Sequence, residues 1–161
     1  FFWTFCDDYL ELVKERAYDQ TDVGQASAAL ALRLALSTLL RLLAPVLAFA
    51  TEESWSWFEE GSIHTAAWPE PLGGWGDARV LGAAGEALIG IRRAKTEAKA
   101  SQKTPVALVS LTADPVTAEA LRLAEADLRA VGRIDRLEIL IDDERAVGIS
   151  VDAVELAPQE A

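Results

Sequence analysis

The sequence has only one cysteine, Cys6, and one histidine, His64. A single cysteine excludes an internal disulfide and a zinc site made of several cysteines, and inside an apolar helix it acts as a small hydrophobe. A single histidine excludes a Ser-His-Asp triad and a two-histidine metal site within this chain. We therefore predict no catalytic residue, metal site or cofactor in this chain, and a structural role in a loop for His64.

The other features that would indicate catalysis are also lacking. The glycines at 73, 74, 82, 85 and 90 do not follow a strand or open a helix, as a phosphate-binding loop requires. The paired acids Glu52-Glu53 and the run Asp142-Asp143-Glu144 suit solvated helix faces and turns, because adjacent side chains on a helix point in different directions. A small-molecule enzyme is therefore the weakest of the functional interpretations.

Basic residues are few, and their total is outweighed by the acids. The 161 residues carry a net charge of -11, which disfavours a polyanionic partner unless the basic residues are clustered. Hydrophobic residues make up 51% of the chain, which is typical of a soluble globular protein. Arg33 and Arg41 interrupt the apolar run 26–50, so we interpret this run as a buried helix and predict no membrane contact. The single cysteine predicts a reducing, cytoplasmic location.

The first 60 residues are expected to form three helices. Apolar residues recur every three or four positions from 2 to 18, and the segment 23–43 is almost wholly apolar, which predicts a central helix. Arg33, Ser37 and Arg41 are spaced four apart and form one stripe that faces solvent or RNA. The third helix follows Pro45. Because Phe1 has no helix cap before it, we expect the chain to begin inside a helix and to be a fragment.

Aromatic residues gather in the third helix and could either fill a core or stack on unpaired bases. Helical spacing favours the core for most of them. Trp55 and Phe58 should take the buried side, which leaves Trp57 as the best candidate for exposure and for contact with RNA.

A basic segment lies at the end of a long predicted helix, 77–101. Between residues 89 and 103 there are five basic residues and one acid, Glu97, in an otherwise acidic chain. Such a cluster can bind a phosphate backbone, although local pairing such as Arg93 with Glu97 is a simpler explanation. We expect the basic half of this helix to project past the core. The RNA-binding candidates are Arg92, Arg93, Lys95, Lys99 and Lys103 here, with Arg33, Arg41 and Trp57 upstream.

The character of the sequence changes after about residue 102. The segments 106–111, 137–141 and 146–151 read as strands, the last two joined by the turn-like run 142–144. Asp114-Pro115 predicts the start of a helix that Gly132 would end. We therefore predict a mainly α fold with two domains, a helical bundle over 1–102 and a small α+β appendage over 103–161.

Several motifs resemble the helical anticodon-binding domain of class I aminoacyl-tRNA synthetases of the valine, isoleucine and leucine group. They are the run FCDDYLELVKE from Phe5, the segment from Leu39 to Trp55 with its T-E-E-x-W sequence, and the run SIHTAAWP from Ser62. The stretch from Ile91 to Pro105 resembles the helix before the C-terminal appendage and is best matched by the valine enzymes. Together these motifs cover about two thirds of the chain.

The resemblance implies a C-terminal region that binds the anticodon stem-loop of tRNA. In that family separate catalytic and editing domains of the same polypeptide use ATP and magnesium to join the amino acid to tRNA. The two ATP-binding signatures of the family are missing here, so this chain alone is not expected to be catalytic. The expected partners are tRNA and those other domains, in a monomer.

Two alternatives remain open from the sequence. The chain could come from an isoleucine or leucine enzyme of the same group, or it could be an acidic helical module that binds another protein. The basic segment favours RNA, because a purely protein-binding acidic bundle does not require it.

Overall fold

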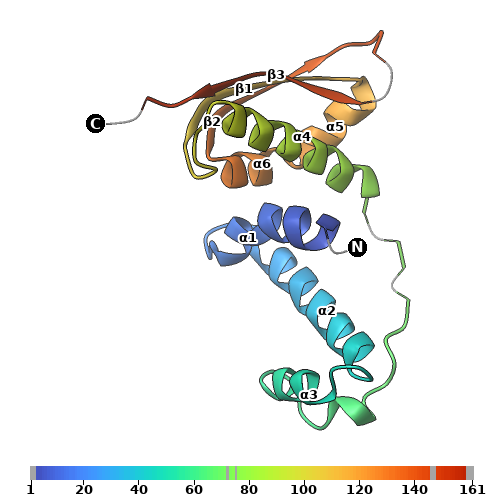
Figure 1. The fold of residues 1–161 in the computed structure, drawn as a ribbon. Coiled ribbons are helices and arrows are strands. Elements are labelled where there is room, and N and C mark those ends of the chain that lie inside the picture. Colours follow the sequence, from blue (N-terminus) through green and yellow to red (C-terminus); the bar gives the residue numbers. More distant parts are fainter. Residues whose placement is uncertain (1–2, 72, 75, 146–147, 159–161) are drawn as a thin grey trace. The chain divides into compact units, whose positions relative to one another are not determined.

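The computed structural model describes residues 3–71, 73–74, 76–145 and 148–158. These residues form six α-helices and one three-stranded sheet, which confirms a mainly α fold with a small α+β part (Figure 1). The chain divides into two compact units, Phe1–Tyr18 with Gly76–Ala161, and Asp19–Trp75. The division predicted near residue 102 stays a prediction.

In the larger unit, helices α4, α5 and α6 cover one face of the sheet (Figure 1). Strand β1 is central: it pairs parallel to β2 and antiparallel to β3, in the order β2-β1-β3. The elements of this unit are a π-helix at Trp3–Tyr9, α1 Leu10–Tyr18, α4 Ala78–Glu97, β1 Val106–Ala113, α5 Pro115–Leu123, α6 Glu125–Gly132, β2 Ile134–Ile141 and β3 Ile149–Leu156.

The core of this unit lies between α4, the helices α5 and α6, and the sheet. Leu88 and Ile91 of α4 meet Leu111 of β1 and Leu128 of α6, all no more than 2% exposed. Burying such side chains contributes about 1.5–3 kcal/mol each. Strands form in all three predicted regions, but β3 runs from Ile149 to Leu156 rather than over 146–151, and residues 146–147 lie outside the described residues. Strands β2 and β3 are not neighbours, because β1 lies between them and pairs with both.

Two helix predictions need correction in this unit. The segment 115–132 is not one helix: α5 ends at Leu123, Ala124 is its C-cap, and α6 then begins. The first helix has nearly the predicted extent, but its residues 3–9 are π-helical, which a spacing of three and four does not distinguish from an α-helix. The predictions at Phe1 and Phe2 lie outside the described residues.

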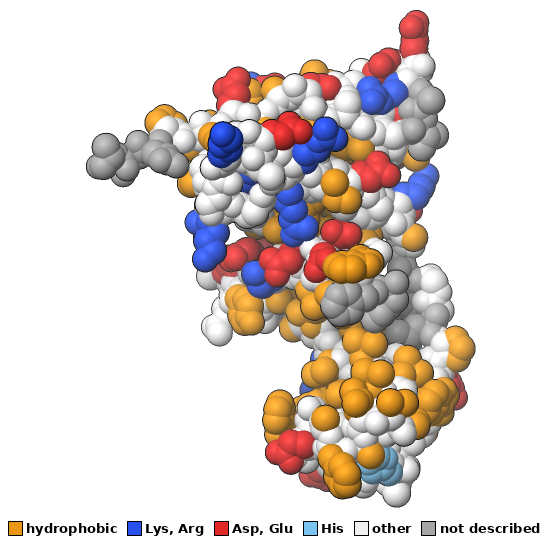
Figure 2. Space-filling view, in the orientation of Figure 1, with side chains coloured by type: hydrophobic (Ala, Val, Ile, Leu, Met, Phe, Trp, Pro, Cys, Tyr) orange, Lys and Arg blue, Asp and Glu red, His pale blue; other side chains and the backbone are white. Residues whose placement is uncertain are grey.

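The smaller unit consists of α2 Gln25–Leu43, α3 Ala48–Ser56 and a short 3-10 helix at Ile63–Thr65. Helix α2 is not buried as predicted: Ala28 is its one buried residue, and Leu30 is 66% exposed. Among the described residues of this unit, α3 and the 3-10 helix are the neighbours that α2 contacts, so much of its apolar surface stays uncovered. Figure 2 shows apolar side chains over much of the visible face of this unit.

Helix α2 is also the one described helix that is long and apolar enough to cross a membrane, by length and composition only. A bundle helix of a soluble protein meets the same criteria. Arg33 and Arg41 lie within it and make polar contacts to Glu59 and Ala67 of the same unit.

Gly90 sets the closest approach of α4 to β3. A Cβ at position 90 would clash with Cγ2 of Val151 and lie 3.2 Å from its Cβ. We expect Gly90→Ala to destabilise the protein, because overpacking costs about 1–3 kcal/mol and the gain in helix propensity is only about 1 kcal/mol. Urea unfolding measures the change.

Gly82 provides the matched control in the same helix, since nothing lies within 4 Å of an added Cβ there. Gly82→Ala should stabilise the protein by about 0.5–1 kcal/mol. In a double-mutant cycle, Val151→Ala should relieve the cost of Gly90→Ala. Strictly additive effects would contradict the proposed contact.

Asp114 fixes the start of α5 and the approach to β3. Its carboxylate accepts hydrogen bonds from the backbone N–H groups of Val116 (3.0 Å), Thr117 (3.2 Å) and Gly148 (3.0 Å). Hydrogen bonds, first from the Thr117 side chain and then from the Gly148 backbone, lower the pKa of Asp114 from 3.8 to about 2. Residue 114 is therefore a charged N-cap at all ordinary pH values.

This depressed pKa predicts a pH dependence of stability. The carboxylate contributes its full stabilisation above about pH 4, and that contribution is lost as the pH falls through about 2. We expect Asp114→Asn, which keeps a capping oxygen but cannot titrate, to make the melting temperature fall less steeply between pH 4 and pH 2. Parallel curves for the two proteins would contradict the assignment.

Candidate nucleic-acid interface

The last turn of α4 is closed by a Schellman motif. The N–H of Ala100 donates to the carbonyl of Lys95 (2.9 Å), and the N–H of Lys99 donates to the carbonyl of Thr96 (2.9 Å). Lys99 takes the left-handed position, with φ of 54°, that glycine usually occupies. The helix therefore ends at Glu97 rather than at 101, and the chain folds back instead of projecting past the core as predicted.

Lys95 is buried, with 1% of its surface exposed. Its Nζ donates to the carbonyl oxygens of Gln102 (3.1 Å) and Gly132 (2.8 Å). Burial lowers the pKa of the Lys95 ammonium, and the nearby charge of Arg133 lowers it further. The prediction that Lys95 lies on an exposed basic face is wrong. Its ammonium group is buried and donates to backbone carbonyls of the segment after α4 and of the end of α6.

Arg92 and Arg93 face different surroundings. The Nη2 of Arg92 donates to the carbonyl of Asp7 (3.1 Å), and its Nη1 lies 4.0 Å from the Asp8 carboxylate. The Nε of Arg93 donates to Glu97 (2.8 Å) on an exposed surface, so the local pairing expected from the sequence is confirmed. The Glu97 carboxylate raises the pKa of Arg93 by this hydrogen bond.

Lys99 and Lys103 are exposed in the segment after α4. Gln102 holds this segment against the helix, since its Nε2 donates to the carbonyl of Arg92 and to Oγ1 of Thr96, both at 3.1 Å. Arg92, Lys95 and Lys103 line one cavity of about 290 Å³, whereas Arg93 lines a different one, against β3. The predicted basic segment is thus divided between two surfaces.

The same cavity has two basic residues that the sequence analysis did not select. Lys14 of α1 forms an ion pair with Glu11 (2.9 Å), and Arg133 follows α6. Arg133 has a φ of 52°, a left-handed conformation. The glycine at position 132 predicts that a helix ends there. The sequence does not predict that Arg133 lies beside Lys95.

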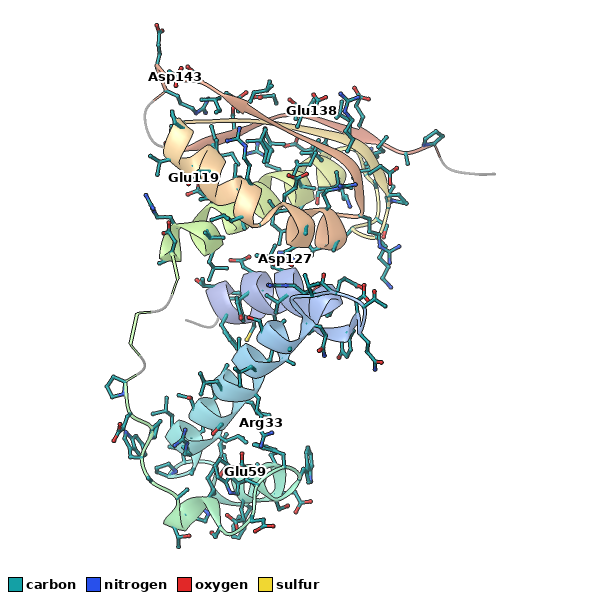
Figure 3. All side chains as sticks on the ribbon, turned by 180° about the vertical axis from the view of Figure 1, so that it is seen from behind. Arg33, Glu59, Glu119, Asp127, Glu138 and Asp143 are labelled. Atoms are coloured by element: carbon teal, nitrogen blue, oxygen red, sulfur yellow. The ribbon has the colours of Figure 1, made fainter. Side chains whose placement is uncertain are left out.

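In the smaller unit, both candidate arginines of α2 are used in contacts. Figure 3 shows Arg33 and Glu59 facing one another, with Nη2 of Arg33 3.0 Å from the carboxylate. Arg41 donates through Nε to the carbonyl of Ser37 and through Nη1 to that of Ala67, both at 3.2 Å. These contacts stabilise the unit, and the RNA role of both arginines stays a prediction.

The aromatic residues at the end of α3 and just after it lie as expected. Trp55 is 8% exposed and packs against Phe58, with ring centroids 5.7 Å apart. Trp57 is 73% exposed, and its Nε1 donates to Glu53 (3.3 Å). Its ring is therefore accessible for stacking. Phe49, which sequence reasoning did not single out, is 93% exposed on the same helix.

Two motifs that are apart in sequence meet in this unit. The Glu52 carboxylate accepts hydrogen bonds from Oγ of Ser62 (3.0 Å) and from the N–H of Ile63 (2.9 Å). The Nε2 of His64 lies 3.3 Å from the carbonyl of Ala48. His64 therefore has the structural role predicted for it, and the T-E-E and S-I-H sequences together fix the loop after α3.

Among the described residues, no group of three or more His, Cys, Asp or Glu side chains is arranged to hold a metal ion. The exposed cations around the end of α4 suit contact with phosphate, whereas the exposed indole of Trp57 in the smaller unit suits stacking with a base.

Comparison with known proteins agrees with this chemistry. Residues 1–110 match a family described as the anticodon-binding domain of tRNA ligase. The chain therefore belongs to the family of anticodon-binding domains of tRNA ligases.

Valine–tRNA ligases are among the curated proteins that the chain is similar to. The one from Leifsonia xyli subsp. xyli is 56% identical over 151 residues, and the one from Salinispora tropica is 49% identical over 160. The one from Thermobifida fusca is 47% identical over 165 residues. These matches cover 91%, 86% and 99% of the chain but only 18% of each relative.

Lys99 offers a direct test of the Schellman motif. A non-glycine residue in the left-handed region costs about 1–2 kcal/mol, and part of that is returned by the greater freedom of glycine in the unfolded chain. Lys99→Gly should raise the free energy of unfolding by about 0.5–1 kcal/mol. Lys99→Ala removes the same charge but keeps Cβ, so it should give no gain. Equal effects of the two substitutions in urea unfolding would contradict the motif.

Proposed function

We propose that this chain binds the anticodon stem-loop of valine tRNA as part of a valine–tRNA ligase. The observation that carries the proposal is the cluster of Arg92, Lys99 and Lys103 around the end of α4, in a chain whose net charge is -11. The chain also belongs to the anticodon-binding family. Phosphate contacts of Arg92 and Lys103 would position the RNA. The exposed Trp57 ring would stack on an unpaired base.

The proposal extends to the larger polypeptide. The chain spans about 18% of the length of the relatives it matches. The catalytic and editing domains, with ATP and magnesium, would belong to the remaining length, and the ligase would act as a cytoplasmic monomer. Proteins that join valine to tRNA need a region that recognises the tRNA, which is the part assigned to this chain.

Two other functions compete with this one. An isoleucine or leucine ligase would use the same fold, but the similar proteins reported above are valine–tRNA ligases. A protein-interaction module is favoured by the exposed apolar residues Val46 (81%) and Phe49 (93%). Such a module would not need the exposed cations Lys99 and Lys103.

Fluorescence anisotropy with labelled valine tRNA and a non-cognate tRNA, across a salt series, tests the proposal. We expect salt-sensitive binding that favours the valine tRNA. A sample that unfolds cooperatively, and is thus folded, but binds neither tRNA at low salt would overturn the proposal in favour of an interaction module.

The electrostatic part of the proposal has its own variants. Lys99→Gln combined with Lys103→Gln should weaken tRNA binding by at least tenfold and reduce the slope of log affinity against log salt by about 2. The control is Arg122→Gln combined with Arg136→Gln, which removes the same charge from exposed sites elsewhere on the unit. Equal losses in both doubles would show that only net charge matters.

A further inference from the structure

The cavity beside Lys95 lies wholly within the larger unit. Its walls come from α1, from α4 and the segment after it, and from the end of α6. Its volume of about 290 Å³ equals that of about ten liquid water molecules at about 30 Å³ each. It therefore has room for a phosphate group and some of its hydration shell.

The charge of the cavity is opposite to that of the whole chain. Two acids, Glu11 and Glu15, line the α1 side, and Lys14 pairs with Glu11. The basic lining residues are Lys14, Arg92, Lys95, Lys103 and Arg133. In a chain of net charge -11, this excess of positive charge is confined to one concave place, where surrounding protein strengthens its field.

Two of these cations make no side-chain contact that would explain their place in the fold. The side chains of Lys103 and Arg133 have no hydrogen-bond or ionic partner among the described residues. The backbone of Arg133 is nevertheless held firmly: its N–H donates to Ala130 (3.2 Å) and its carbonyl accepts from Val106 (2.8 Å). The fixed backbone limits where the unpaired guanidinium can reach, and a guanidinium is a suitable donor for a carboxylate or a phosphate group.

Lys95 adds a buried charge at the same place. Two of the three N–H donors of its ammonium group bond the carbonyls of Gln102 and Gly132. Burial disfavours its charged form and lowers its pKa, and the nearby charge of Arg133 lowers the pKa further. An anion between them would remove this repulsion.

The negative ends of α4 and α6 provide a simpler reason for cations here. That reason accounts for Lys95, which donates to the last carbonyl of α6. It does not account for Lys103, which lies six residues beyond the end of α4 and bonds no helix carbonyl among the described residues. The cavity therefore has more positive charge than its helix ends require.

We propose that this cavity is a phosphate pocket, in which Arg133, Lys103 and Arg92 bind one phosphate group of the RNA backbone against the floor formed by Lys95. The proposal rests on the tRNA-binding function proposed above and assigns one contact within it. Arg133 is the residue whose loss should matter most, since its side chain is free and its backbone is fixed.

Arg133→Gln tests the pocket by anisotropy with the same tRNA. Because the variant loses a charge-assisted hydrogen bond, we expect affinity to fall about tenfold or more, with a salt slope smaller by about 1. Arg122→Gln, on the last turn of α5 and away from the cavity, should change affinity less than about twofold. Equal effects of the two variants would overturn the proposal.

Inorganic phosphate distinguishes the two sources of the ligand. If RNA phosphate occupies the pocket, phosphate should compete with tRNA for the wild type more strongly than for Arg133→Gln. If phosphate raises the melting temperature through Arg133 but tRNA affinity does not depend on Arg133, the RNA assignment is wrong. If the wild type binds no tRNA at all, the proposed function fails, whereas a wild type and an Arg133→Gln variant that bind equally refute the pocket alone.

Arg133→Gly guards against a folding artefact. Glycine suits the left-handed φ of 52° at this position, so this variant should be at least as stable as the wild type in urea. It should nevertheless lose the same tRNA affinity as Arg133→Gln. Wild-type affinity in this stable variant would overturn the proposal.

Discussion

The buried ammonium of Lys95 is the interaction on which the larger unit depends. It joins the last turn of α4, the segment around Gln102 and the end of α6 through two hydrogen bonds to backbone carbonyls. A buried ammonium without partners would be very costly, so these three segments must stay together. Their positions in turn fix Arg92 and Arg133 around one cavity.

Hydrophobic periodicity and the residues that begin or end helices predicted most of the helices and the burial of aromatic residues around the end of α3. Trp55 and Phe58 are three residues apart and therefore share a face, which left Trp57 outside, as observed. The positions of helix ends were harder to predict. Lys99 in a left-handed conformation ends α4 without the glycine that normally marks such an end.

The candidate interface was only partly predictable, for a physical reason. Lysine is almost never fully buried, so a sequence gives no reason to place Lys95 inside. Its partners are backbone carbonyls, which every residue has and no pattern distinguishes. Arg133 is 38 residues from Lys95, and only the path of β1, α5 and α6 brings them together.

In the smaller unit, composition led to a wrong prediction, namely that the apolar helix α2 would be central and buried. The sequence reports how apolar α2 is, but not how many neighbours it has, and the described neighbours cover little of it. Exposed apolar surface of this extent is typical of contact with other macromolecular surface. Trp57 and Phe49 extend it onto α3, where stacking with bases is chemically suitable.

Hydrogen–deuterium exchange with and without valine tRNA would test most directly whether RNA binds at the cations around α4. If it does, the peptides covering residues 99–105 and 130–134 become protected on tRNA binding, while those of β3 exchange as before. Protection confined to β3, or no change in either region at tRNA concentrations that saturate binding, would contradict the assignment of the interface.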